Sequence, residues 1–71
     1  SSAASDVYKR QGTLNVVVFD VLGRRIATLH NGTLAAGEHQ FNWHANTASG
    51  VYFLQVSAPG WSEMRKLVLL K

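Results

Sequence analysis

The feature that most constrains the fold of this chain is the alternation of short β-rich runs with turn residues from Thr13 onward. Along these runs apolar side chains recur at every second position, which is the period of a strand with one face in a core. No stretch of useful length has a helical apolar period, and the connections are of hairpin length. The pattern predicts an all-β domain, an antiparallel sandwich or half of one.

Five runs are expected to form strands: Thr13–Asp20, Arg25–Leu29, Glu38–His44, Val51–Ser57 and Trp61–Leu70. In the first run Leu14, Val16 and Val18 share one face, and in the second run Ile26 and Thr28 share one. In the third run His39, Phe41 and Trp43 point one way, and in the fourth Tyr52, Leu54 and Val56 form the inner face. In the first run Val17 and Phe19 make the second face apolar as well, which is typical of a strand near the middle of a sheet. The order of the strands is predicted by the sequence, but their pairing is not.

Turn signals occur in three of the four connections between these runs, and the fourth connection is the polar loop Ala45–Ser49. Gly23 is free to take a positive φ in the turn that follows Asp20, and Pro59-Gly60 predicts the last turn. His30-Asn31-Gly32 predicts a type I′ hairpin turn, since Asn-Gly is the strongest short hairpin signal.

The length of 71 residues allows one small domain, in which burial of surface is limited. The absence of cysteine excludes a disulfide scaffold, a thiolate metal site and a cysteine nucleophile. No apolar run approaches the roughly 20 residues of a membrane-spanning helix. The formal charge is +3, but its basic residues are scattered, so a nucleic-acid surface is a weak interpretation.

Residues 1–11 do not resemble the rest of the chain. The stretch Asp6-Val7-Tyr8-Lys9-Arg10-Gln11 can be encoded by GAT-GTG-TAT-AAG-AGA-CAG, which is similar to the end of a transposase adaptor used for sequencing libraries. We therefore interpret residues 1–11 as a sequencing-adaptor scar or a disordered linker, and residues 12–71 as the domain. The alternative is a natural Ser/Ala-rich linker that runs into a strand.

A search for catalytic and binding groups favours structural roles. His39 and His44 lie five apart on one strand and face opposite sides, so they cannot share a metal ion. Asp20 ends a strand before a turn, where an aspartate commonly accepts backbone hydrogen bonds. No nucleophile elbow and no Gly-rich phosphate loop occurs. We expect no enzyme activity, no cofactor and no metal site. Carbohydrate binding through an exposed Trp61 stays a minor alternative.

Four sequence blocks together resemble the type A C-terminal sorting domain of the type IX secretion system. They cover nearly everything from Leu14 to the end of the chain, and they are Val18–Leu29, Ala36–Trp43, Ser49–Phe53 and Met64–Lys71. These blocks are similar to the family patterns V-Y-D-x-x-G-x-x-V-x-x-L, A-G-x-H-x-x-x-W, S-G-V-Y-F and x-x-K-x-x-x-x-K. The same pattern is shared by the immunoglobulin-like domain of flagellar hook-capping proteins.

The resemblance implies an immunoglobulin-like β-sandwich whose motif residues are structural: Asp20, Gly23, Gly37, Trp43, Gly50 and Tyr52. It implies a non-catalytic tag, covalently part of a larger cargo protein, that passes through the periplasm to the cell surface or the medium. The partners would be an outer-membrane translocon and a sortase. The residues that this machinery would read are those of the last strand: Lys66, Val68, Leu69, Leu70 and Lys71.

One departure from the sorting family affects the expected fold. Members usually begin with an N-P-x-x-P-x-T-x-I-x-Y-x-L stretch that supplies the first strands, and residues 1–11 stand in its place. The sequence therefore predicts an N-terminally truncated sandwich of five to six strands, with an unpaired edge and a partly open core. We expect such a domain to be poorly stable or to self-associate. The flagellar hook-capping module remains the first alternative function, and a carbohydrate-binding accessory module the second.

Overall fold

The computed structural model describes the backbone of residues 2–9 and 11–70, and the side chains of residues 11–44 and 46–70. These residues form six strands and no helix, which confirms the predicted all-β class. The strands are β1 (Ser2–Lys9), β2 (Gly12–Asp20), β3 (Arg25–Leu34), β4 (Glu38–Ala45), β5 (Gly50–Ala58) and β6 (Trp61–Leu69).

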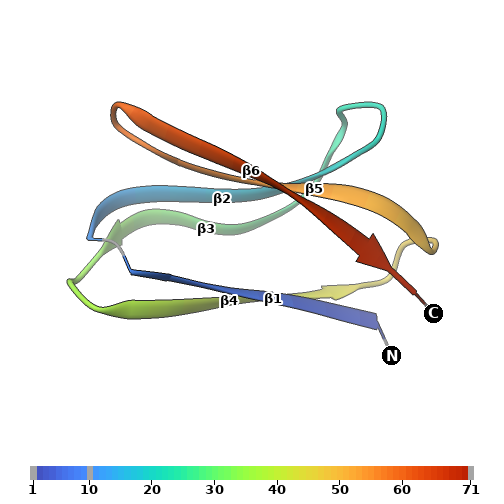
Figure 1. The fold of residues 1–71 in the computed structure, drawn as a ribbon, viewed down its shortest axis with the longest axis horizontal. Coiled ribbons are helices and arrows are strands. Elements are labelled where there is room, and N and C mark those ends of the chain that lie inside the picture. Colours follow the sequence, from blue (N-terminus) through green and yellow to red (C-terminus); the bar gives the residue numbers. More distant parts are fainter. Residues whose placement is uncertain (1, 10, 71) are drawn as a thin grey trace.

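The strands form two antiparallel sheets that lie in two layers (Figure 1). The larger sheet has the order β3-β2-β5-β6, and the smaller one pairs β1 with β4. β2 therefore lies between β3 and β5, as its two apolar faces predict. Within the described part of the chain the second layer has half as many strands as the first, so it covers only part of the larger sheet.

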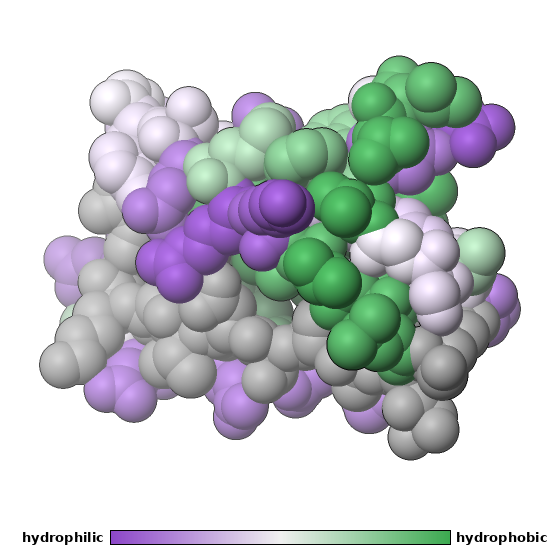
Figure 2. Space-filling view, turned by 45° about the vertical axis from the view of Figure 1, so that its right-hand side comes forward, coloured by the Kyte–Doolittle hydropathy of each residue, from purple (hydrophilic) through white to green (hydrophobic). Residues whose placement is uncertain are grey.

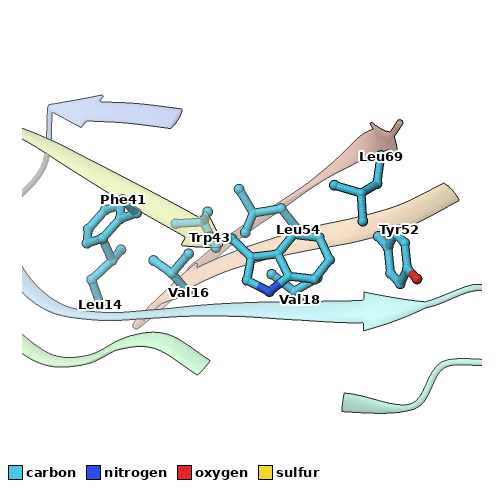
Figure 3. Close-up of a cluster of buried hydrophobic side chains, with 9 residues drawn as sticks. Leu14, Val16, Val18, Phe41, Trp43, Tyr52, Leu54 and Leu69 are labelled. Carbon is cyan, nitrogen blue, oxygen red and sulfur yellow. The ribbon is translucent and has the colours of Figure 1, made fainter. Parts of the chain in front are cut away.

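The core fills the space between the two layers (Figure 3). The alternation along β2, β4 and β5 predicts its residues correctly, because each strand turns every second side chain towards the facing sheet. β6 adds one residue that the sequence pattern did not place inward. The core consists of Leu14, Val16, Val18, Phe41, Trp43, Tyr52, Leu54, Val56 and Leu69.

The predicted hairpin turn at His30-Asn31-Gly32 is wrong. These residues continue β3, where His30 pairs with Val16, Asn31 with Asn15 and Gly32 with Leu14. Register shifts after Val16 and after Val18 allow the longer strand to follow the twist of its neighbour. The ladder that β2 offers over its whole length outweighs the local preference of Asn-Gly for a turn.

Ser2–Lys9 forms β1 and pairs with β4 over its full length, from Ser2 opposite Ala45 to Lys9 opposite Glu38. No strand is predicted from the sequence for this segment, because residues 1–11 are set aside there as an adaptor scar or a disordered linker. β4 has no other strand beside it in the described part of the chain, so an extended segment that pairs with it satisfies backbone groups that would otherwise be left open. The adaptor origin of residues 1–11 stays a prediction.

Candidate functional site

The turn between β2 and β3 is closed by the carboxylate of Asp20, the last residue of β2. We call residues 20–24 the Asp20 turn. Its Oδ1 atom accepts hydrogen bonds from the backbone N–H groups of Leu22 and Arg24, both at 2.9 Å. Its Oδ2 atom accepts a hydrogen bond from Nε of Arg24 at 2.7 Å. The backbone N–H of Gly23 also donates to the carbonyl oxygen of Asp20 at 3.0 Å. Both carboxylate oxygens are thus directed into the turn itself.

These contacts favour the charged form of Asp20. The hydrogen bond from the backbone N–H of Arg24 is the main cause that lowers the pKa of Asp20 below its ordinary value of 3.8. Burial acts in the opposite direction, and the Arg24 side chain adds to the lowering. A carboxyl group that serves as a general acid near neutral pH needs a raised pKa. The shift at Asp20 therefore fits a group that anchors a turn.

Gly23 supplies the backbone conformation that this turn requires. Its φ is +82°, in the left-handed region where residues with a Cβ are strained. A Cβ at this position would meet no atom within 4 Å, so the requirement for glycine is conformational and not a matter of space. Of the other two motif glycines, Gly37 lies in the β3–β4 connection and Gly50 begins β5.

Trp43 and Tyr52 join the two layers near this turn (Figure 3). Trp43 is on β4 and Tyr52 on β5, and their rings meet edge to face with centroids 5.1 Å apart. The hydroxyl of Tyr52 donates a hydrogen bond to the carbonyl oxygen of Ala48 at 2.7 Å. Tyr52 also lies opposite Asp20 in the β2–β5 register. Tyr52 therefore connects the core, the Asp20 turn and the loop before β5.

An open hollow of about 450 Å³ lies between the Asp20 turn and the loop before β5. Ile26, Thr47 and Ser49 are among the residues that line it. Among the described residues its charged lining groups are Asp20 and Arg24, which bind each other. The hollow is open, and the two charged side chains beside it already bind each other. This arrangement fits a structural role better than acid–base catalysis.

The structure separates the residues that the sequence assigned to sorting recognition. Val68 and Leu70 are exposed, at 62% and 79%, and Lys66 is exposed as well. Leu69 is 3% exposed and packs in the core. Lys71 lies outside the described residues. A partner that reads the folded β6 can therefore contact Lys66, Val68 and Leu70, but it cannot reach the side chain of Leu69.

His30, His39 and Trp61 make local contacts. Nε2 of His30 lies 3.2 Å from the carbonyl oxygen of Gly32, and Nε2 of His39 lies 2.6 Å from that of Ala35. Within the described ranges, no three His, Asp or Glu side chains gather closely enough to hold a metal ion. Trp61 is half-buried and packs against the core, so it offers less of a sugar-stacking surface than a fully exposed ring would.

Several large apolar side chains are exposed, and in the view of Figure 2 hydrophobic surface gathers toward the right. Val21 and Leu22 in the Asp20 turn are 65% and 74% exposed, and Met64 on β6 is 56% exposed. Phe19 and Phe53 lie opposite each other on the outward face of the larger sheet. Sequence reasoning did not select this face as functional, although the apolar second face of β2 and the Val-Leu pair in the turn indicate it.

Comparison with protein families gives a match. The model of the FlgD Ig-like domain matches residues 2–60, which include β1 to β5 and the turn before β6. No type IX sorting-domain model matched. Neither the curated proteins nor the solved structures gave a match. In the described part of the chain no helix could cross a membrane. Because the match covers most of the chain and agrees with its β-sandwich architecture, the chain belongs to the FlgD Ig-like domain family.

Proposed function

We propose that this chain is a non-catalytic structural module of a larger flagellar hook-capping protein, and that it acts outside the cytoplasm as a contact domain in hook assembly. The observation that carries this proposal is the family match over residues 2–60, which spans five of the six strands. Hook capping is the function linked to that family.

The geometry of the Asp20 turn supports a structural role. The carboxylate of Asp20, the candidate for acid–base catalysis, accepts hydrogen bonds from Leu22 and Arg24 within its own turn. The turn in turn presents Val21 and Leu22 to solvent. A rigid turn that displays apolar side chains is suited to contact with a neighbouring protein surface, because little conformational entropy is lost on binding.

A domain exchange in a flagellated bacterium tests this proposal. The immunoglobulin-like domain of the host's hook-capping protein is replaced by this chain, and hooks are counted by electron microscopy beside a motility assay. We expect hooks to form. The matched control carries Leu22→Ser together with Val21→Ser. These changes remove the two exposed apolar side chains of the turn and leave Asp20 in place. A chimaera that accumulates to the host protein's level and assembles no hooks would contradict the proposal.

A second candidate function, the type IX sorting signal, is favoured by one observation. The block Met64–Lys71 that resembles the sorting motif lies beyond the family match, and its Val68 and Leu70 are exposed. In this reading the module directs its cargo to an outer-membrane translocon and a sortase, with no bond broken by the module itself.

The sorting function has its own test. The chain is fused to the C-terminus of an exported reporter in a bacterium that has this secretion system, and surface display is measured with and without residues 68–71. Loss of display on deletion supports sorting. Display that is unchanged by the deletion excludes recognition of this segment.

A further inference from the structure

We propose that β6 is a dimerisation edge, at which two copies of this chain pair their β6 strands antiparallel about a two-fold axis through Met64. The inference goes beyond the proposed function, because neither hook capping nor sorting requires it. It rests on the position of β6 in the sheet, on the direction of the backbone groups of Ser62, Met64 and Lys66, and on the order of charges along the strand.

β6 lies at one edge of the larger sheet, with β5 on one side and no further strand of the described chain on the other. The two-residue turn Pro59-Gly60 places Ala58 opposite Trp61, and the register continues without a shift to Leu69 opposite Gly50. A loop of this length closes on a hydrogen-bonded pair, after which bonded and non-bonded pairs alternate. Ser62, Met64 and Lys66 therefore direct their backbone N–H and C=O groups to the open edge.

A strand added at this edge extends the sheet by the same ladder that holds β5 and β6 together. In a two-fold antiparallel pair the central residue faces its own copy, and residues at equal distances on either side of it face each other. With Met64 at the centre, its edge-directed N–H and C=O groups bond reciprocally to those of the second Met64. The backbone direction of β6 is therefore compatible with this register.

The charges along β6 favour this register over the neighbouring registers. A pair centred on Glu63, Arg65 or Lys66 places that residue opposite its own copy, so that like charges meet. A pair centred on Met64 instead places Glu63 of each copy opposite Arg65 of the other. It also places Trp61 opposite Leu67 at both ends, which matches one apolar side chain with another. The order Trp-Ser-Glu-Met-Arg-Lys-Leu of residues 61–67 is thus self-complementary about its middle residue.

Glu63 and Arg65 are already positioned for this contact. Within one chain Nε of Arg65 lies 3.0 Å from Oε2 of Glu63, and both side chains remain substantially exposed. In the dimer the Glu63–Arg65 ion pairs of the two chains lie next to each other. Each carboxylate then lies between two guanidinium groups, one from each chain. Exposed ion pairs are weak and screened by salt, so the dimer is expected to be reversible and to weaken as the ionic strength rises.

Complementary charge reversals test the proposal by sedimentation analysis of the 71-residue chain over a concentration series. We expect the unaltered chain to approach twice its 7.8 kDa mass. Glu63→Arg alone and Arg65→Glu alone each bring like charges together in the pair, and each should remain monomeric. Mixing the two variants restores both opposite-charge contacts between chains and should restore the dimer. The ion pair within each chain stays broken in that mixture, so recovery reports the contact between chains.

Three outcomes would overturn the proposal: an unaltered chain that stays monomeric, single variants that dimerise as the unaltered chain does, or a mixture that stays monomeric. Disulfide trapping provides a second measurement should a charge variant fail to fold. The chain has no cysteine, so Met64→Cys introduces a single thiol on the two-fold axis. Two opposed residues of a hydrogen-bonded pair are about 5.5 Å apart at Cα, within the range of a disulfide. Met64→Cys should cross-link rapidly on oxidation, whereas Ser62→Cys, which faces position 66, should not. Equal cross-linking of the two variants would contradict the register.

Discussion

The indole ring of Trp43 and the phenol ring of Tyr52 meet edge to face across the two sheets, with centroids 5.1 Å apart and an interplanar angle of 70°. Trp43 is 6% exposed and Tyr52 is 7% exposed, so this contact is inside the core. It holds the smaller sheet to the larger one at the end of the molecule where the Asp20 turn and the loop before β5 meet. The contact therefore links the two layers directly.

Removing the indole ring should separate the layers at this end. We expect Trp43→Ala to lower the free energy of unfolding by about 3–5 kcal/mol, the usual cost of emptying an aromatic site in a core. Since a domain of this size has a small total stability, the variant should be largely unfolded at room temperature. Urea unfolding followed by far-ultraviolet circular dichroism measures the loss of stability. Tyr52→Phe keeps the ring contact and loses the hydrogen bond to Ala48, so it should cost only about 1 kcal/mol. Equal losses in the two variants would contradict the assigned importance of the ring contact.

The carboxylate of Asp20 should stabilise the fold through the hydrogen bonds it accepts as well as through its charge. Asp20→Ala removes the acceptor for the N–H groups of Leu22 and Arg24, and we expect it to lower the urea midpoint of unfolding. Asp20→Asn keeps an acceptor oxygen and should recover much of that loss. Should the Ala and Asn variants prove equally unstable, the ion pair with Arg24, and not the backbone hydrogen bonds, would be the main contribution.

Stability should depend on pH through the same carboxylate. The pKa of Asp20 is lowered from 3.8 in the folded chain, mainly by the N–H of Arg24, so the unfolded state binds the proton more tightly. The contribution of Asp20 is therefore fully present above pH 3.8 and is lost as the pH falls through the folded pKa. Urea midpoints measured at decreasing pH should show this loss in the unaltered chain. The Asp20→Asn variant should show a smaller acid-induced change, and an identical change would exclude Asp20 as its source.

Gly23 offers a test of backbone strain without a steric clash. Its φ of +82° is unfavourable for any residue with a Cβ, although the space around it is open. We expect Gly23→Ala to cost about 1–2 kcal/mol, as a single left-handed residue does. Gly23→Asn should cost less, because asparagine tolerates this region better. Thermal midpoints of the two variants compare the costs directly, and a neutral Gly23→Ala would show that the turn can adopt another conformation.

The faces of the strands could be predicted from the sequence, but their neighbours could not. Leu14, Val16 and Val18 alternate with period two, and that period alone identifies an inward face. It contains no information about which strand lies beside β2, so the β2–β5 pairing came only from the structure. The Asn31-Gly32 prediction failed because a turn signal is local, whereas the ladder with β2 is a property of the whole sheet.

The same distinction applies to the candidate site. Asp20 and Gly23 belong to one turn, so their spacing in the sequence indicates that they act together. The hydrogen bond from Tyr52 to Ala48 and the ring contact with Trp43 depend on how the layers pack, and spacing does not encode that. The burial of Leu69 could have been found from the period of β6, since Leu67 and Leu69 alternate with the exposed Val68 and Leu70.

The pairing of β1 with β4 and of β2 with β5 also sets the order in which this chain can fold as it is synthesised. β4, the partner of β1, is made only after two intervening strands, and the larger sheet cannot join its two hairpins until β5 has emerged. Contacts between residues so distant in sequence make folding slow, typically milliseconds to seconds for sandwiches of this kind. A nascent chain that ends before Gly50 therefore exposes the inward faces of β2 and β4. Its protection at that stage has to come from the ribosome or a chaperone and not from its own structure.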